Sequence, residues 1–221
     1  EKMASNFFDD AHPDSEALLK RGPCAKDIDE LVATALTQVV SEVDPDLIKR
    51  YQQLVGSLLY AATNTRPDVA FSVGYLCRAM SKPTPDLYLA ALRVLGYLYR
   101  TKHLGLRYQG SDKKVYGMSD SDWAVRHSTS GFVFMFSQAA ISWGSKKQAS
   151  VALSSCEAEI VAGSEAAKEA VHIDRLSNSL GLGDDKPIDL FMDNQSAIAI
   201  AYNPEMHNKT KHIERRHFFI R

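Results

Sequence analysis

Cysteine is scarce in this sequence. The chain holds three cysteines in 221 residues, Cys24, Cys77 and Cys156. Three scattered cysteines are too few for a disulfide framework, and their spacing does not match a zinc knuckle. We therefore expect all three to be reduced side chains that take part in packing.

Long hydrophobic runs are also missing. No apolar stretch approaches the ~20 residues that a membrane-spanning helix requires, and residues 1–10 lack the layout of a signal peptide. These absences argue against a membrane partner. They predict an intracellular protein, located in a cytoplasmic particle, in the nucleus or in both.

The chain has no large excess of charge of either sign. The formal net charge is −1, so any surface that binds nucleic acid must be local. With 45% hydrophobic and 24% charged residues, the composition is that of a globular protein with one large domain or two modest ones. The chain lacks a starting methionine and stops at Arg221 within an apolar pattern, which suggests a piece of a longer protein.

The first half of the chain has the periodicity of helices. Residues 1–46 show only weak helical character, at Leu31–Val43, before a break at Asp44-Pro45. Beyond it, the helical pattern recurs three times between proline-containing segments, and we expect residues 47–103 to form a small helical subdomain. The predicted helices are Leu47–Thr63, Val69–Met80 and Asp86–Thr101.

After Lys102 the hydrophobic period changes from 3.6 towards 2, which is typical of strands. Residues 104–221 therefore predict an α/β domain, in which three successive strands form an antiparallel meander. The predicted strands are Leu104–Tyr108, Lys114–Ser119, Gly131–Phe136, Ala140–Trp143 and Ile188–Met192, and the predicted helices are Ser154–Leu180 and Asn194–Tyr202.

Carboxylates follow two of these strands. Asp120 and Asp122 come after Lys114–Ser119, and side chains two residues apart share one face of a strand. The third strand of a meander runs parallel to the first, so the next helix starts at the edge where the first strand ends. A right-handed crossover through that helix lays Ile188–Met192 parallel to the first strand. Asp193, which follows, therefore reaches the same edge.

The long helix offers two acids to this edge. Glu157 and Glu159 lie ~200° apart around a helix, so only one can face the sheet. Small and apolar residues share the face of Glu159, whereas the face of Glu157 looks solvated, and we expect Glu159 to point inward. The face of Glu159 holds Ala162, Gly163, Ala166, Ala170 and Ile173, and that of Glu157 holds Val161, Ser164, Lys168, His172 and Arg175.

Asp120, Glu159 and Asp193 are thus the candidate metal ligands. Three clustered carboxylates repel one another unless a cation neutralises them. Oxygen ligands of this number suit Mg²⁺ or Mn²⁺, and two such ions ~4 Å apart can activate a water in phosphodiester cleavage. In the alternative interpretation Asp193 is only a helix N-cap and Asp120 only a turn residue. The combination of three favours the metal site.

Several motifs occur in a characteristic order. They are residues 119–123 (SDSDW), 128–131 (STSG), 141–148 (ISWGSKKQ), 157–159 (EAE), 193–198 (DNQSAI) and 207–214 (HNKTKHIE). Together they resemble the ribonuclease H domain of copia-type LTR retrotransposon polyproteins. Upstream, residues 55–60 (VGSLLY), 65–68 (TRPD) and 80–83 (MSKP) resemble the segment that joins reverse transcriptase to ribonuclease H in the same polyproteins.

The resemblance implies a ribonuclease H-like fold that cuts the RNA strand of RNA–DNA hybrids with two Mg²⁺ or Mn²⁺ ions. By motif position, Asp120 corresponds to the first metal ligand, Glu159 to the helix ligand and Asp193 to the third. Asp122 becomes a neighbour of the site. Residues 1–46 would be the end of a reverse transcriptase region, and this upstream domain and the hybrid would be the partners.

The sequence departs from the family pattern in three places. The hairpin loop between Trp123-Ala124 and Arg126-His127 is shortened by a few residues. Glu214 stands where the family usually has aspartate. The family's fourth acid is expected in a helix beyond Arg221, and Glu214 is a weaker candidate for that role. We therefore expect the domain to be truncated at its C-terminal end, with incomplete activity in isolation.

Basic residues occur near the predicted site and in the tail. A solvated surface is the ordinary role of such residues. Beside a site that cuts hybrids, they become candidate contacts to phosphates, and 2′-hydroxyl contacts would distinguish the RNA strand. The candidates are Lys146, Lys147, Lys209, Lys211, His212 and Arg215.

The sequence thus predicts a metal-dependent endonuclease for RNA–DNA hybrids within a retrotransposon polyprotein. One alternative is a non-catalytic nucleic-acid-binding remnant of a decayed element, to which the shortened loop and the truncated end point. A weaker alternative is another ribonuclease H-like enzyme, such as a transposase or an integrase.

Overall fold

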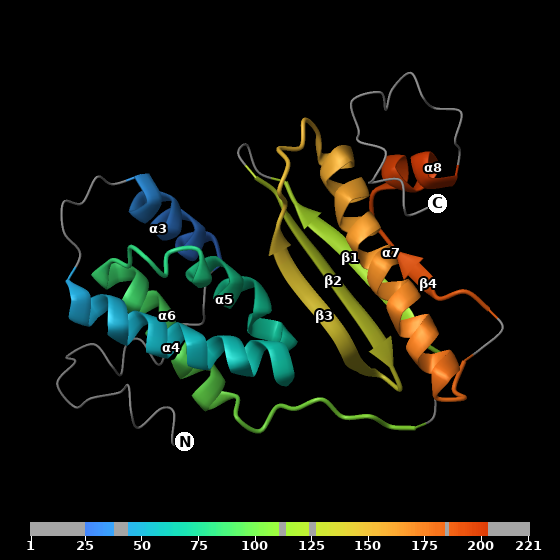
Figure 1. Cartoon of the computed structure of the whole chain (residues 1–221), viewed down its shortest axis with the longest axis horizontal. Helices are drawn as coiled ribbons and strands as arrows, with labels where there is room; N and C mark the ends of the chain where they lie inside the picture. Colours follow the sequence, from blue (N-terminus) through green and yellow to red (C-terminus); the bar gives the residue numbers. More distant parts are fainter. Residues whose placement is uncertain (1–24, 38–43, 111–113, 124–126, 184–185, 203–221) are drawn as a thin grey trace. The chain divides into compact units, whose positions relative to one another are not determined.

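The computed structural model describes residues 25–37, 44–110, 114–123, 127–183 and 186–202. The chain divides into two compact units, Glu1–Leu106 and Arg107–Arg221 (Figure 1). In the described parts, no helix combines the length and the apolar character needed to cross a bilayer.

The first unit is helical. Its helices pack through a core in which Tyr51, Leu54, Leu76 and Leu87 are fully buried. Two of these helices begin at side-chain caps, because Asp44 and Thr84 each accept a hydrogen bond from a backbone N–H group of the first turn. In both helices a proline occupies that turn. The elements are α3 (Ala25–Thr37), α4 (Pro45–Asn64), the 3₁₀ helix η1 (Pro67–Val69), α5 (Ala70–Cys77) and α6 (Pro85–Arg100).

The second unit is a mixed sheet covered by a long helix. The strand order is β3-β2-β1-β4, in which β1 pairs antiparallel with β2, β2 antiparallel with β3, and β1 parallel with β4. The predicted α/β class and the ribonuclease H-like sheet, a three-stranded meander plus one parallel strand, are confirmed. The elements are β1 (Tyr116–Asp122), β2 (Thr129–Phe136), β3 (Ala139–Lys147), α7 (Ser155–Ser179), β4 (Asp189–Phe191) and α8 (Gln195–Tyr202).

The core of this unit lies between the sheet and α7, which crosses one sheet face in Figure 1. Phe134 of β2 is fully buried against Ala166 and Ile173 of α7. The start of α7 packs on α8 through Ile160 and Ala197. Because α7 is fixed to the sheet and to α8, its first turns hold a set position above the sheet edge.

One predicted strand does not form, and several predicted strand ends are displaced, most of all that of β3, which runs to Lys147 rather than Trp143. Residues 104–108 are not a strand, although Gln109 N donates to Ser137 O (3.1 Å) and Tyr108 Oη to Ala140 O (2.8 Å). These two hydrogen bonds attach the segment to β3 and to the turn before it, but they do not form a β-ladder. Leu104 and Tyr108, two of the alternating apolar residues, remain half-exposed. Alternation of apolar and polar residues is therefore not sufficient to form a strand here. Conversely, β1 continues past Ser119 to Asp122, because its last residues pair with the start of β2.

Gly117 of β1 is required by a close approach to the core. A Cβ at this position would lie 2.4 Å from Cε1 of Phe134, whose ring is fully buried. Gly117→Ala must displace that ring, and we expect a loss of about 1–3 kcal/mol in the free energy of unfolding. Chemical denaturation monitored by circular dichroism measures the change.

The matched control is Gly56→Ala in α4, where an added Cβ meets nothing within 4 Å. Because alanine is the better helix former, this variant should gain up to about 1 kcal/mol. A Gly117→Ala protein as stable as the parent would show that the packing of β1 on Phe134 is looser than the structure indicates.

Candidate metal centre

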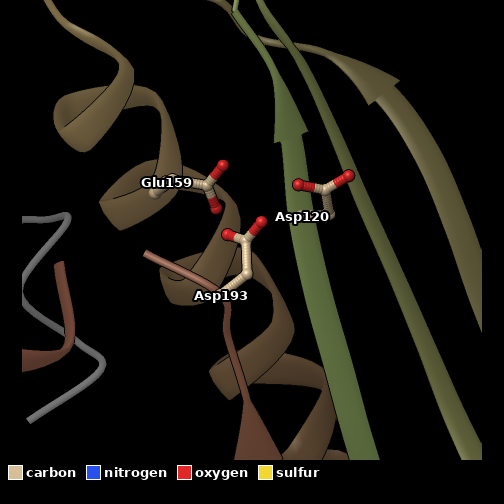
Figure 2. A group of neighbouring side chains, drawn as sticks. All are labelled: Asp120, Glu159 and Asp193. Carbon is tan, nitrogen blue, oxygen red and sulfur yellow. The ribbon is translucent and has the colours of Figure 1, made fainter. Parts of the chain in front are cut away.

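Three carboxylates meet at one edge of the sheet of the second unit. Asp120 extends from β1, Glu159 from α7 and Asp193 from the residues after β4 (Figure 2). One carboxylate oxygen from each lies within 4.8 Å of the others. The three residues singled out by the sequence are therefore brought together, at a separation that one or two cations can bridge.

The parallel pairing of β1 and β4 explains two of the three positions. Tyr116 pairs with Asp189 and Met118 with Phe191. Continuing this register by two residues places Asp193 beside Asp120.

Asp193 does not cap α8, because Asn194 Oδ1 accepts the hydrogen bond from Ala197 N (3.0 Å). The interpretation of Asp193 as an N-cap is therefore wrong, as is that of Asp120 as a turn residue, since Asp120 lies within β1.

The start of α7 is held by two hydrogen bonds that link Glu157 to the residues before the helix. Ser154 Oγ accepts from Glu157 N (3.1 Å), and Glu157 Oε2 accepts from Leu153 N (2.8 Å). The sequence prediction that Glu157 faces solvent is wrong, since this side chain is buried. It is buried because its carboxylate satisfies backbone N–H at the helix start. On the predicted solvated face Val161 and Ser164 are also buried, and only the later residues Lys168, His172 and Arg175 are exposed.

Glu159 points to the sheet, as its position on the helix predicted. Its Oε1 accepts two hydrogen bonds from Ser121, one from Oγ (2.7 Å) and one from the backbone N (3.2 Å). Burial raises the pKa of the Glu159 carboxyl, the hydrogen bonds from Ser121 oppose this rise, and the nearby Asp120 and Asp193 add to it. The residue is thus held where its negative charge is unfavourable without a cation.

The second oxygen of Glu159 indicates what the site accepts. Oε2 is buried and has no hydrogen-bond partner among the described residues. A buried carboxylate oxygen without a donor is costly, and a bound cation would satisfy it. All three ligands offer oxygen, which suits a hard divalent ion such as Mg²⁺ or Mn²⁺. The residues present therefore fit the metal that the sequence predicted.

Other predicted residues lie apart from this cluster or outside the described residues. Asp122 is exposed at the end of β1 and does not join the three carboxylates. Lys146 and Lys147 are exposed at the end of β3, which runs parallel to β1, so they reach the same edge two strand spacings of ~4.8 Å away. The shortened loop at 124–126 and the tail candidates lie outside the described residues. These tail residues are Lys209, Lys211, His212, Glu214 and Arg215.

Two residues that support the site were not identified from the sequence. Ser121 could have been found, because it shares a face of β1 with the buried residues Gly117 and Ser119. Gln148 ends the motif at residues 141–148, but the motif did not indicate a role for its side chain. Its buried Nε2 donates to Ser130 Oγ (2.9 Å) and to Ala158 O (2.9 Å), which ties the end of the sheet to the helical turn before Glu159.

Ser121 should therefore control metal affinity. Ser121→Ala removes the 2.7 Å hydrogen bond that orients the Glu159 carboxylate. Loss of an outer hydrogen bond to a metal ligand typically weakens metal binding, and we expect roughly tenfold lower affinity for Mn²⁺ in isothermal titration calorimetry. Ser119→Ala is the matched control, because Ser119 Oγ is buried on the same strand without a hydrogen-bond partner among the described residues. Equal Mn²⁺ affinity in both variants would contradict the assigned role of Ser121.

Comparisons with known proteins show where related sequences occur. No protein-family model matches the chain. A retrovirus-related Pol polyprotein from transposon TNT 1-94 of Nicotiana tabacum is 41% identical over 175 residues, which cover 77% of this chain and 13% of that protein. The corresponding polyprotein from transposon RE2 of Arabidopsis thaliana is 37% identical over 176 residues, covering 77% of this chain and 12% of that protein.

A shorter relative is matched over most of its length. The secreted RxLR effector protein 161 of Plasmopara viticola is 45% identical over 126 residues, which cover 55% of this chain and 89% of that protein. By contrast, the chain spans only about an eighth of the plant polyproteins. The chain belongs to the family that includes the Plasmopara viticola protein and is homologous to a segment of the retrovirus-related Pol polyproteins of copia-type transposons.

Proposed function

We propose that the second unit is a ribonuclease H domain that hydrolyses the RNA strand of RNA–DNA hybrids. The observation that carries this proposal is the meeting of Asp120, Glu159 and Asp193, from three separate elements, at one edge of a ribonuclease H-like sheet. The homology to retrovirus-related Pol polyproteins supports it, because the ribonuclease H domain that the sequence motifs resemble belongs to polyproteins of this kind. In this proposal the first unit joins the domain to an upstream reverse transcriptase in the same polyprotein.

The three carboxylates would hold two Mg²⁺ or Mn²⁺ ions. When bound, these ions would supply activation of the attacking water and stabilisation of the leaving oxygen. Ser121 holds Glu159 in place for this role. A fourth acid is expected beyond Arg221, with Glu214 the weaker candidate. We also propose that the enzyme acts inside the cell, in a cytoplasmic particle, the nucleus or both.

Binding of the substrate would depend on positively charged side chains around this edge of the sheet. Lys146 and Lys147 are exposed at the end of β3 and can contact phosphates on one side of the carboxylates. The tail would add further phosphate contacts. The tail residues proposed for this are Lys209, Lys211, His212 and Arg215.

Cleavage of a 5′-labelled RNA strand in an RNA–DNA hybrid tests the proposal, with a chain that is extended past Arg221. Asp120→Asn should lower the cleavage rate by more than about 100-fold, since loss of an outer partner of a metal ligand already costs 10–100-fold. Asp122→Asn is the matched control, because Asp122 lies on the same strand outside the cluster, and it should retain most activity.

Two outcomes would contradict the proposal. Cleavage that is undiminished in Asp120→Asn would show that the cluster does not carry the reaction. Hybrid binding without metal-dependent turnover in the extended chain would instead favour a non-catalytic nucleic-acid-binding remnant.

A further inference from the structure

Three large apolar side chains are exposed together beside the metal centre. Trp123 is 50% exposed, Val151 48% and Leu153 73%. Trp123 lies beside the segment that carries the other two, because its indole Nε1 donates to the carbonyl oxygen of Ala152 (3.3 Å), the residue between them. We call Trp123, Val151 and Leu153 the apolar ledge.

The ledge is held by the same elements that carry the carboxylates. Trp123 follows the last residue of β1, three positions after Asp120, and Leu153 precedes the cap of α7. Leu153 N donates to Glu157 Oε2, and this hydrogen bond fixes the segment before α7. The exposure of the ledge is therefore a property of an anchored segment.

Its chemistry limits what it can contact. The single donor of the Trp123 side chain is used within the protein, so the ring offers a partner only its apolar faces and edges. Val151 and Leu153 offer no polar group. The positively charged side chains at the same sheet edge belong to another strand and are those of Lys146 and Lys147 in β3. The edge thus presents carboxylates for metal, ammonium groups for phosphate and a separate apolar surface.

A polynucleotide presents the complementary set of groups. Its phosphates suit the metal centre and the lysines, whereas the faces of its bases and the carbons of its sugars suit an apolar surface. The wide, shallow minor groove of an A-like duplex exposes those sugars to a ridge of this kind. A strand whose phosphate lies at the carboxylates must also run past the elements that carry them.

We propose that the apolar ledge binds the sugars and bases of the RNA–DNA hybrid next to the phosphate that is cut. This inference rests on the proposed function and adds a substrate-positioning surface to it. The ledge takes no part in the bond cleavage, so its loss weakens substrate binding and leaves the chemical step and the Mg²⁺ requirement intact.

Fluorescence of Trp123 tests contact directly. The chain has two tryptophans, so Trp143→Phe leaves Trp123 as the single reporter. Combined with Asp193→Asn, in Mg²⁺, this variant is titrated with a short RNA–DNA hybrid, and binding is followed separately by anisotropy of a dye on the hybrid. We expect bound hybrid to lower the acrylamide quenching constant of Trp123 by at least about twofold, because stacked or covered rings exclude the quencher.

Hybrid binding without any change in Trp123 quenching would overturn the proposal. So would a Trp123 that is already protected from acrylamide before hybrid is added, because another surface would then cover the ledge.

Kinetics of Leu153→Ser provide an independent test. In the extended chain we expect KM for the hybrid to rise roughly fivefold while kcat and the Mg²⁺ dependence stay unchanged. The matched control is Leu182→Ser, because Leu182 is 63% exposed beyond the C-terminal end of α7, and its KM should not change.

The two proposals fail in different ways. Normal cleavage with an unchanged KM in Leu153→Ser removes the ledge and leaves the ribonuclease H assignment standing. Absence of both cleavage and hybrid binding in the parent protein removes both.

Discussion

Mutual repulsion between three carboxylates is the constraint on which the second unit depends. Asp120, Glu159 and Asp193 are held with oxygens within 4.8 Å of one another, and the two aspartates add to the rise that burial causes in the pKa of Glu159. Only a rigid frame keeps such a cluster together. The parallel pairing of β1 with β4 fixes the two aspartates, and the packing of α7 on Phe134 fixes the glutamate above them.

The frame extends to hydrogen bonds that would otherwise look incidental. Ser121 contributes both its backbone N–H and its hydroxyl to one oxygen of Glu159, and the other oxygen is buried without a donor among the residues that the structure describes. Gln148, and the hydrogen bond from Glu157 N to the Ser154 hydroxyl, hold the first turns of α7. Each of these contacts orients a ligand or the element that carries it, and together they leave one unsatisfied oxygen where a cation can bind.

Topology was predictable from the sequence because strand pairing rules allow few arrangements. A meander, a crossover helix and one more strand must deliver Asp120 and Asp193 to the same edge, and the ~100° step of a helix selects Glu159 over Glu157. What the pattern could not reveal depends on neighbours far away in sequence. The alternation at residues 104–108 predicts a strand, but a strand also needs a partner along its full length, and here Tyr108 and Gln109, at the end of the segment, make the hydrogen bonds to β3 and to the turn before it.

The burial of Glu157 shows the same limit. Its helical face looks polar in sequence, yet the first turns are enclosed and the carboxylate finds backbone donors at the helix start. Likewise, the role of Gln148 depends on Ser130 and Ala158, which the fold alone brings near it.

The central claim is that the three carboxylates bind metal for cleavage of RNA in a hybrid. The most direct measurement is a crystal structure of the extended chain carrying Asp193→Asn, with Mn²⁺ and an RNA–DNA hybrid, using anomalous scattering to locate the ions. We predict Mn²⁺ bound to Asp120 and Glu159 and contacting a phosphate of the RNA strand, whereas Mn²⁺ elsewhere, or the DNA strand at the carboxylates, would contradict the claim.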